Sequence, residues 1–328
     1  MDFARTIIVL VAIGSLVALP EAMGDPAPGK HRIAFINGGP EAPNELNIAA
    51  FRAGLAELGY VEGRNLILDV RWGDQKLDQL PALVSELLSA KPQVIVSTGG
   101  PSTARAVANA TSSVPVVFIT GDPVGEKLVP NLAHPGGNAT GISVMAGDLE
   151  AKRLELLQQL VPRAKRIAGI WNPAQPFGEH AFRNTEEAAG RLGMTLQWWK
   201  VRNAAELEQA FGEIANARAD ALFVVSDPLL GYERARIVEF ASKHRLPAIY
   251  FWREFAEIGG LASYGTSLSA MYRQSASYVD QILKGAKPGD LPIQQPMTFE
   301  LILNLRAAET LGVAIPNSVR QRADEVIE

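Results

Sequence analysis

The sequence contains no cysteine among its 328 residues. This absence excludes disulfides, thiolate metal sites, a cysteine nucleophile and a lipidated N-terminal cysteine. Histidine is also scarce, because only His31, His134, His180 and His244 occur and they are isolated from one another. No metal-ligand spacing such as H-x-x-x-H is present, so we expect neither a metal site nor a cofactor.

The motifs that mark common enzyme and nucleotide sites are missing as well. The chain has no G-x-S-x-G elbow and no H-E-x-x-H pair, so a hydrolase or metalloprotease is disfavoured. It has no G-x-G-x-x-G fingerprint and no Gly-Lys-Ser/Thr of a phosphate-binding loop. We therefore expect a protein that is not an enzyme and that binds neither phosphate nor dinucleotide.

The chain also lacks an excess of positive charge. Its 31 basic and 35 acidic residues give a formal net charge of −4, which offers no electrostatic footprint for nucleic acid. The composition, 47% hydrophobic and 20% charged, is that of a globular protein. A chain of this length favours two domains over one.

The N-terminus carries an uncharged apolar run at residues 6–19 (TIIVLVAIGSLVAL), preceded by Arg5. A membrane span needs roughly 20 apolar residues, and this shorter run is typical of a secretory signal. Pro20 ends the run, and Ala22 and Gly24 place small residues at a cleavage site. We expect residues 1–24 to be a signal peptide cleaved near Gly24, with the mature protein in the periplasm; a retained membrane anchor is the alternative.

Strands and helices alternate along the rest of the chain. Residues 32–37 (RIAFIN) predict a buried strand, and the spacing of Ile48, Phe51, Leu55 and Leu58 predicts an amphipathic helix. Further strands are predicted at 66–70, 94–97 and 114–119, with a short helix from 102 to about 110. This alternation indicates parallel βαβ units with helices on both faces of a sheet.

The second half of the chain repeats the first. Residues 166–172 (RIAGIWN) resemble 32–37, and 246–250 (LPAIY) resemble 114–118 (VPVVF), both at offsets of about 130 residues. The alternative is chance similarity between short apolar strands. We predict an α/β fold with two doubly wound parallel-sheet lobes joined by a multi-strand hinge. Lobe 1 is expected to comprise 30–142 with about 266–291, and lobe 2 to comprise 143–265 with about 292–328.

Ligands of open α/β sheets bind beyond the carboxyl ends of the strands. The segment 97–103 (STGGPST) follows such a strand, and a proline at the first helical position leaves the next amides free to bind an anion. We predict that Thr98, Gly99, Ser102 and Thr103 hold a ligand carboxylate. An ordinary glycine turn with a helix cap is the alternative.

Other polar and aromatic residues follow strands in the same way. Asp227 and Asp122 are candidates for binding a ligand ammonium, although a carboxylate beside proline also forms turns. Aromatic side chains at strand ends line an apolar pocket or pack in the core. The remaining candidate binding residues, all at predicted strand ends, are Asn37, Trp171, Asn172, Trp252 and Tyr264.

Seven further segments carry a pattern that extends over most of the chain. They are 51–65 (FRAGLAELGYVEGRN), 114–118 (VPVVF), 121–125 (GDPVG), 135–142 (PGGNATGI), 278–288 (YVDQILKGAKP), 290–293 (DLPI) and 304–316 (NLRAAETLGVAIP). Together they resemble a known family, the ABC-transporter substrate-binding proteins of the type I periplasmic fold, including its tryptophan/tyrosine-type members. The resemblance covers the chain from about residue 30 to its end.

The resemblance implies a monomeric receptor that captures a small-molecule ligand between its lobes. An amino acid or a related carboxylate is the implied solute, and an ABC permease in the inner membrane is the implied partner. The family analogy places the ligand carboxylate at Thr98, Gly99, Ser102 and Thr103, and an amine at Asp227. The alternative is a periplasmic ligand-sensing subunit that serves a membrane signalling partner.

Overall fold

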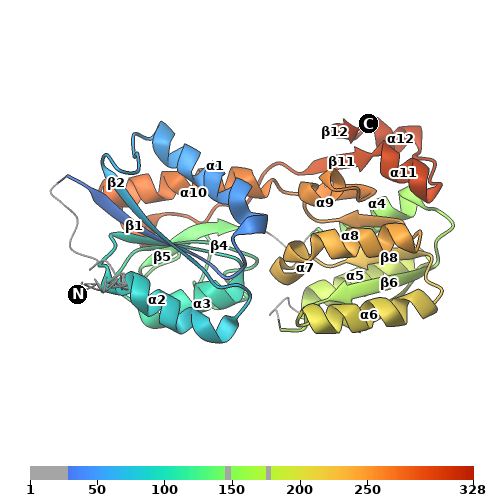
Figure 1. The fold of residues 1–328 in the computed structure, drawn as a ribbon, viewed down its shortest axis with the longest axis horizontal. Helices are drawn as coiled ribbons and strands as arrows, with labels where there is room; N and C mark the ends of the chain where they lie inside the picture. The colour runs from blue at the N-terminus through green and yellow to red at the C-terminus, as the bar shows by residue number, and fades with distance from the viewer. Residues whose placement is uncertain (1–28, 145–148, 175–178) are drawn as a thin grey trace, which may run out of the picture.

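The structure, a computed structural model, describes residues 29–144, 149–174 and 179–328. The predicted signal peptide at residues 1–24 lies outside the described residues. Two lobes lie side by side, and each consists of a β-sheet between layers of helices (Figure 1).

Lobe 1 is built on a five-stranded parallel sheet of order β2-β1-β3-β4-β5. Its strands are β1 (His31–Asn37), β2 (Leu66–Trp72), β3 (Val94–Thr98), β4 (Val116–Thr120) and β5 (Ala139–Ser143). Its helices are α1 (Glu45–Glu57), α2 (Leu80–Ser89), α3 (Pro101–Ala110) and α10 (Leu268–Leu283), with the 3₁₀ turns η1 (Ala42–Asn44), η2 (Leu77–Gln79) and η3 (Pro288–Asp290).

Lobe 2 is built on a seven-stranded sheet of order β12-β11-β10-β9-β8-β6-β7. Its strands are β6 (Arg166–Trp171), β7 (Thr195–Lys200), β8 (Ala221–Val224), β9 (Ala248–Tyr250), β10 (Ala262–Gly265), β11 (Glu300–Asn304) and β12 (Glu325–Ile327). Its helices are α4 (Glu150–Leu160), α5 (Glu179–Arg191), α6 (Ala204–Asn216), α7 (Pro228–Tyr232), α8 (Arg234–Lys243), α9 (Arg253–Glu257), α11 (Leu305–Leu311) and α12 (Asn317–Arg320).

The two sheets share one topology. The order β7-β6-β8-β9-β10 in lobe 2 repeats the order β2-β1-β3-β4-β5 in lobe 1, and all these pairings are parallel. Lobe 2 then adds β11, which runs antiparallel to β10, and β12. The internal repeat and the doubly wound α/β fold predicted from the sequence are confirmed.

Successive side chains of β1 point to opposite faces of the sheet, and both faces are covered by helices. Ile33 and Phe35 pack against α1 and α10, whereas Ala34 and Ile36 pack against α2 and α3. All four side chains are fully buried. A central parallel strand with apolar residues on both faces requires helices on both faces, which is the arrangement observed.

The chain passes between the lobes more than once. Helix α10 comes late in the sequence yet lies against α1 in lobe 1 (Figure 1). A Cβ on Gly54 of α1 would lie 2.6 Å from the carbonyl oxygen of Arg273, so glycine permits this close helix packing. After α10, the Gln294 carbonyl accepts from the Ser143 amide at 2.9 Å, which holds the returning chain beside β5.

Among the described residues, no helix combines the length and apolar character that crossing a membrane requires. In the same residues, no cluster of three or more His, Cys, Asp or Glu side chains forms a metal-binding group.

A buried ion pair ties α4 to the strand ends of lobe 2. Arg153 and Glu150 are each 1% exposed, and Arg153 Nη2 lies 2.5 Å from Glu150 Oε1. Glu150 accepts from the Ser226 amide at 3.0 Å, and Arg153 donates to the Tyr264 carbonyl at 3.2 Å. The pair thus connects the ends of β8 and β10, which flank the three-residue strand β9.

We predict that Arg153→Met destabilises the protein by about 3–5 kcal/mol, because it leaves the Glu150 carboxylate buried without its partner. Urea unfolding followed by circular dichroism measures this cost. The matched control is Lys152→Met, which removes an exposed ion pair with Glu155 on the same helix and should cost less than about 1 kcal/mol. Equal costs for the two variants would contradict a structural role for the buried pair.

Candidate ligand-binding site between the lobes

Asn37 stands at the carboxyl end of β1, where the strand order of lobe 1 reverses between β1 and β3. Its side chain is fully buried. Asn37 Nδ2 donates to Thr98 Oγ1 at 2.9 Å and to the Tyr272 hydroxyl at 3.0 Å. This amide therefore joins the ends of β1 and β3 to helix α10.

The oxygen of the same side chain reaches the other lobe. Asn37 Oδ1 accepts from the Gly39 amide at 2.7 Å and from the hydroxyl of Tyr232, which ends α7 in lobe 2, at 3.0 Å. An asparagine amide has two N–H donors and two acceptor lone pairs. In the observed arrangement all four have protein partners.

The equivalent position of lobe 2 holds a second polar pair. Asn172 follows β6 and donates from Nδ2 to Asp227 Oδ2 at 3.3 Å, and Asp227 follows β8. Asp227 is 3% exposed and accepts from the Leu230 amide at 3.2 Å, so it caps α7. The structure thus brings together Asn37 with Thr98, and Asn172 with Asp227, at matching points of the two sheets.

Helix α7 packs on the glycine loops of lobe 1, and Figure 1 shows α7 at the edge of lobe 2 that faces lobe 1. A Cβ on Gly39 would lie 2.2 Å from the Tyr232 ring, and one on Gly100 would lie 2.8 Å from Pro228. Gly99 and Gly100 also have φ values of +83° and +101°. These glycines are required both for the backbone conformation and for the close approach of lobe 2.

The N-terminus of α3 has the features of an anion site. Gly100 is its N-cap, no side chain caps it, and Pro101 occupies the first turn. The hydroxyl of Thr103 is fully buried beside Gly38 and has no hydrogen-bond partner. Free first-turn amides, the positive end of the helix dipole and an unpartnered hydroxyl together favour a carboxylate.

Two tyrosines at the interface between the lobes are uncharged: Tyr272 is buried and Tyr232 is partly buried. Burial raises the pKa of Tyr272 to about 12 and raises the pKa of Tyr232 well above its ordinary value. Both phenols therefore stay protonated at neutral pH and act as neutral hydrogen-bonding groups. Charge at this interface comes from Asp227 and from groups such as Arg234, which donates to the Pro43 carbonyl at 3.4 Å.

The predicted aromatic residues have different surroundings. Trp252 is partly buried and packs against the hydrophobic cores of both lobes. Trp171 is partly buried against the core of lobe 2 and packs on Phe182, with ring centroids 5.4 Å apart, and its indole Nε1 is buried without a partner. Tyr264 is also partly buried against that core, 6.2 Å from the ring of Phe299.

Asp122, the other predicted carboxylate, is exposed in the turn that follows β4. It accepts from the Gly125 amide at 2.9 Å, and its own amide donates to Glu126 at 2.8 Å. These are the contacts of a turn-forming residue.

Sequence reasoning missed Tyr232, Tyr272 and Asn44, which contacts both Asn37 and Tyr232. Tyr232 and Tyr272 lie on helices, 195 and 235 residues from Asn37. The only sequence signal for Tyr232 is its place shortly after Asp227-Pro228, which follows a predicted strand.

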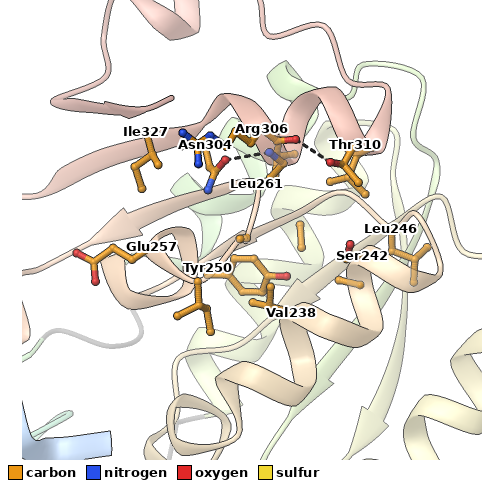
Figure 2. Close-up of a pocket in the computed structure, with 17 residues that line it drawn as sticks. Val238, Ser242, Leu246, Tyr250, Glu257, Leu261, Asn304, Arg306, Thr310 and Ile327 are labelled. Carbon is orange, nitrogen blue, oxygen red and sulfur yellow. Dashed lines mark hydrogen bonds between the residues drawn. The ribbon is translucent and has the colours of Figure 1, made fainter.

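A separate cavity of about 380 Å³ lies in lobe 2, lined by residues of α8, α9 and α11 (Figure 2). It adjoins Ala248 and Leu261, where β9 and β10 begin, which is the end of the sheet opposite to Asn172 and Asp227. None of the predicted binding residues lines it.

Comparison with known proteins gives consistent matches. The family model described as ABC transporter substrate binding protein matches residues 43–327. The tyrosine-binding protein of Clostridioides difficile (strain R20291) is 26% identical over 280 residues, covering 84% of this chain and 80% of that protein.

Two solved structures have closely similar folds. A conserved domain protein from Vibrio cholerae is 27% identical with a TM-score of 0.84, covering 90% of this chain and 99% of that one. An ABC domain in complex with L-Trp from Streptococcus pneumoniae is 24% identical with a TM-score of 0.83, covering 91% and 100%.

We predict that Gly99→Ala destabilises the protein by about 3 kcal/mol, because a Cβ there would lie 2.5 Å from the Gly38 amide nitrogen and 2.6 Å from Asn37 Oδ1. Gly63→Ala is the matched control. Gly63 has a similar φ of +81° but open space around its Cβ position, so it should cost only about 1 kcal/mol. Chemical denaturation gives both values, and a Gly99 variant as stable as the Gly63 variant would contradict the tight packing.

Proposed function

Because this chain belongs to the ABC transporter substrate binding protein family, we propose that it captures an amino acid between its lobes and delivers it to an ABC permease in the inner membrane. The family is one of binding proteins, and the chain is not an enzyme.

The observation that carries the proposal is the uncapped N-terminus of α3 with the buried, unpartnered hydroxyl of Thr103. A buried hydroxyl without a partner costs free energy, which a ligand oxygen would recover. The amides of Ser102 and Thr103 belong to the same first turn. We place the ligand carboxylate there.

The ligand ammonium is assigned to lobe 2. Asp227 is a buried carboxylate on the element that packs against the α3 loop, since Pro228 meets Gly100. An acid on one lobe and a helix N-terminus on the other match the two charges of an amino acid. Closure over a zwitterion would then satisfy both lobes at once.

An aromatic amino acid is the favoured solute. The relatives are named for tyrosine binding and for a complex with L-Trp. Trp252, partly buried between the cores of the two lobes, is the aromatic side chain placed to contact such a ligand.

Proteins of this family work outside the cytoplasm, and we propose that this chain acts in the periplasm as a monomer after cleavage near Gly24. A ligand-sensing subunit that serves a membrane signalling partner would use the same site. Ligand-stimulated ATP hydrolysis by a reconstituted permease separates the two functions, because only the transport function predicts it.

We predict that Thr103→Val weakens binding of L-tyrosine or L-tryptophan about tenfold, because valine keeps the shape but removes a hydrogen bond to a charged oxygen. Isothermal titration calorimetry measures the dissociation constants. Thr310→Val on α11 is the control, since its hydroxyl bonds only to the Arg306 carbonyl. An unchanged affinity in Thr103→Val, or equal binding of L-tryptophan amide by the unaltered protein, would contradict the carboxylate site.

We predict that Asp227→Asn abolishes measurable amino-acid binding while leaving the fold intact. Asparagine caps helices as well as aspartate does, so the variant removes the charge and keeps the cap of α7. Differential scanning calorimetry should give a melting temperature close to that of the unaltered protein. A variant that still binds both amino acids with unchanged affinity would remove Asp227 from the proposed site.

A further inference from the structure

We infer that Tyr232 is a latch that holds the two lobes closed. Asn37 accepts the hydrogen bond of this latch and does not contact the ligand. This inference rests on the proposed capture of a solute between the lobes, but it does not depend on the identity of that solute. It follows from the hydrogen bonds of a single buried amide and from the packing of one short helix.

The hydrogen-bonding capacity of Asn37 is filled from both lobes. Three of its four hydrogen-bonding positions are filled from within lobe 1, by Thr98, Tyr272 and the Gly39 amide. The fourth is filled by Tyr232 from lobe 2. When the lobes are closed, Asn37 has no capacity left for a ligand, so its polar role is to receive the tyrosine.

The ring of Tyr232 fits closely against glycines of lobe 1. The ring lies over Gly39, 2.2 Å from a Cβ position there, so any side chain would collide with it. The hydroxyl also lies near Gly99, 3.1 Å from a Cβ position there. Two loops of lobe 1 thus have glycine where the phenol enters. The loops form a socket shaped for an aromatic ring from the opposite lobe.

The hydrogen bond between Tyr232 and Asn37 stabilises the closed state only modestly. Opening the lobes exposes the phenol and the Asn37 oxygen to water, which replaces the lost bond, so the latch contributes a modest net amount. A modest, reversible contact of this kind biases the open and closed populations without locking them. Part of the ligand-free protein should therefore already be closed.

The absence of cysteine makes this population directly measurable. Asn109→Cys on α3 and Glu239→Cys on α8 place one spin label on each lobe at exposed positions. Double electron–electron resonance on the ligand-free, full-length protein then gives the distribution of distances between the lobes. Tyr232→Phe removes only the latching hydroxyl.

The matched control is Tyr60→Phe, which removes a phenol hydroxyl bonded to Asp280 at 2.9 Å within lobe 1. We expect the ligand-free parent to show a short-distance population that corresponds to closed lobes. The ratio of this closed population to the open population should fall about three- to tenfold in Tyr232→Phe and stay unchanged in Tyr60→Phe. Where an amino acid binds, its dissociation constant should rise by a similar factor in Tyr232→Phe alone.

Two results would overturn the latch. One is a ligand-free distance distribution that is the same in the parent and in Tyr232→Phe, including one that is wholly open in both. The other is tighter binding by Tyr232→Phe, which would mean that the phenol occupies the place of the ligand. If neither tyrosine nor tryptophan binds the parent, the proposed solute is wrong, and the distance measurement still decides the latch.

Discussion

The arrangement of the two lobes depends on one buried amide. Asn37 lies where the strand order of lobe 1 reverses, and its hydrogen bonds join β1, β3, α10 and the opposite lobe. A buried amide without hydrogen-bond partners would cost free energy. The partners of Asn37 must therefore stay in place for the amide to remain fully bonded. The loop glycines, the position of α10 and the docking of α7 are all consistent with this amide being fully bonded.

The two lobes share a topology but differ in how the helices that follow their strands are capped. Lobe 1 leaves the N-terminus of α3 without a side-chain cap, whereas lobe 2 caps α7 with Asp227. One lobe therefore presents a positive helix end and the other a carboxylate. Two lobes of one topology therefore differ in charge at their facing ends, as the proposed capture of a zwitterion requires.

Sequence patterns predicted the doubly wound lobes because their signals are local, namely apolar strands, helical spacing and glycines at turns. The same patterns placed Asn37, Thr98, Asn172 and Asp227 at strand ends, where the structure pairs them. Tyr232 and Tyr272 could not be predicted, since their contacts with Asn37 arise only when α7 and α10 pack against lobe 1.

Local sequence patterns also do not show how deeply a side chain is buried. Glu150 and Arg153 have the spacing of an exposed helical ion pair, yet both are buried against strand ends. Trp171 and Tyr264 follow the strand-end pattern of pocket residues, and both are partly buried against the core of lobe 2. In each case the deciding factor is which helix covers the strand end, and that depends on contacts between distant segments.

The most direct test of the account is a crystal structure of the protein grown with saturating L-tryptophan or L-tyrosine, whichever binds more tightly. The account predicts density for the amino acid between the lobes, with its carboxylate on the Ser102 and Thr103 amides and its ammonium beside Asp227. An amino acid bound with its carboxylate elsewhere, or lobes that close with no density between them at saturation, would contradict the account.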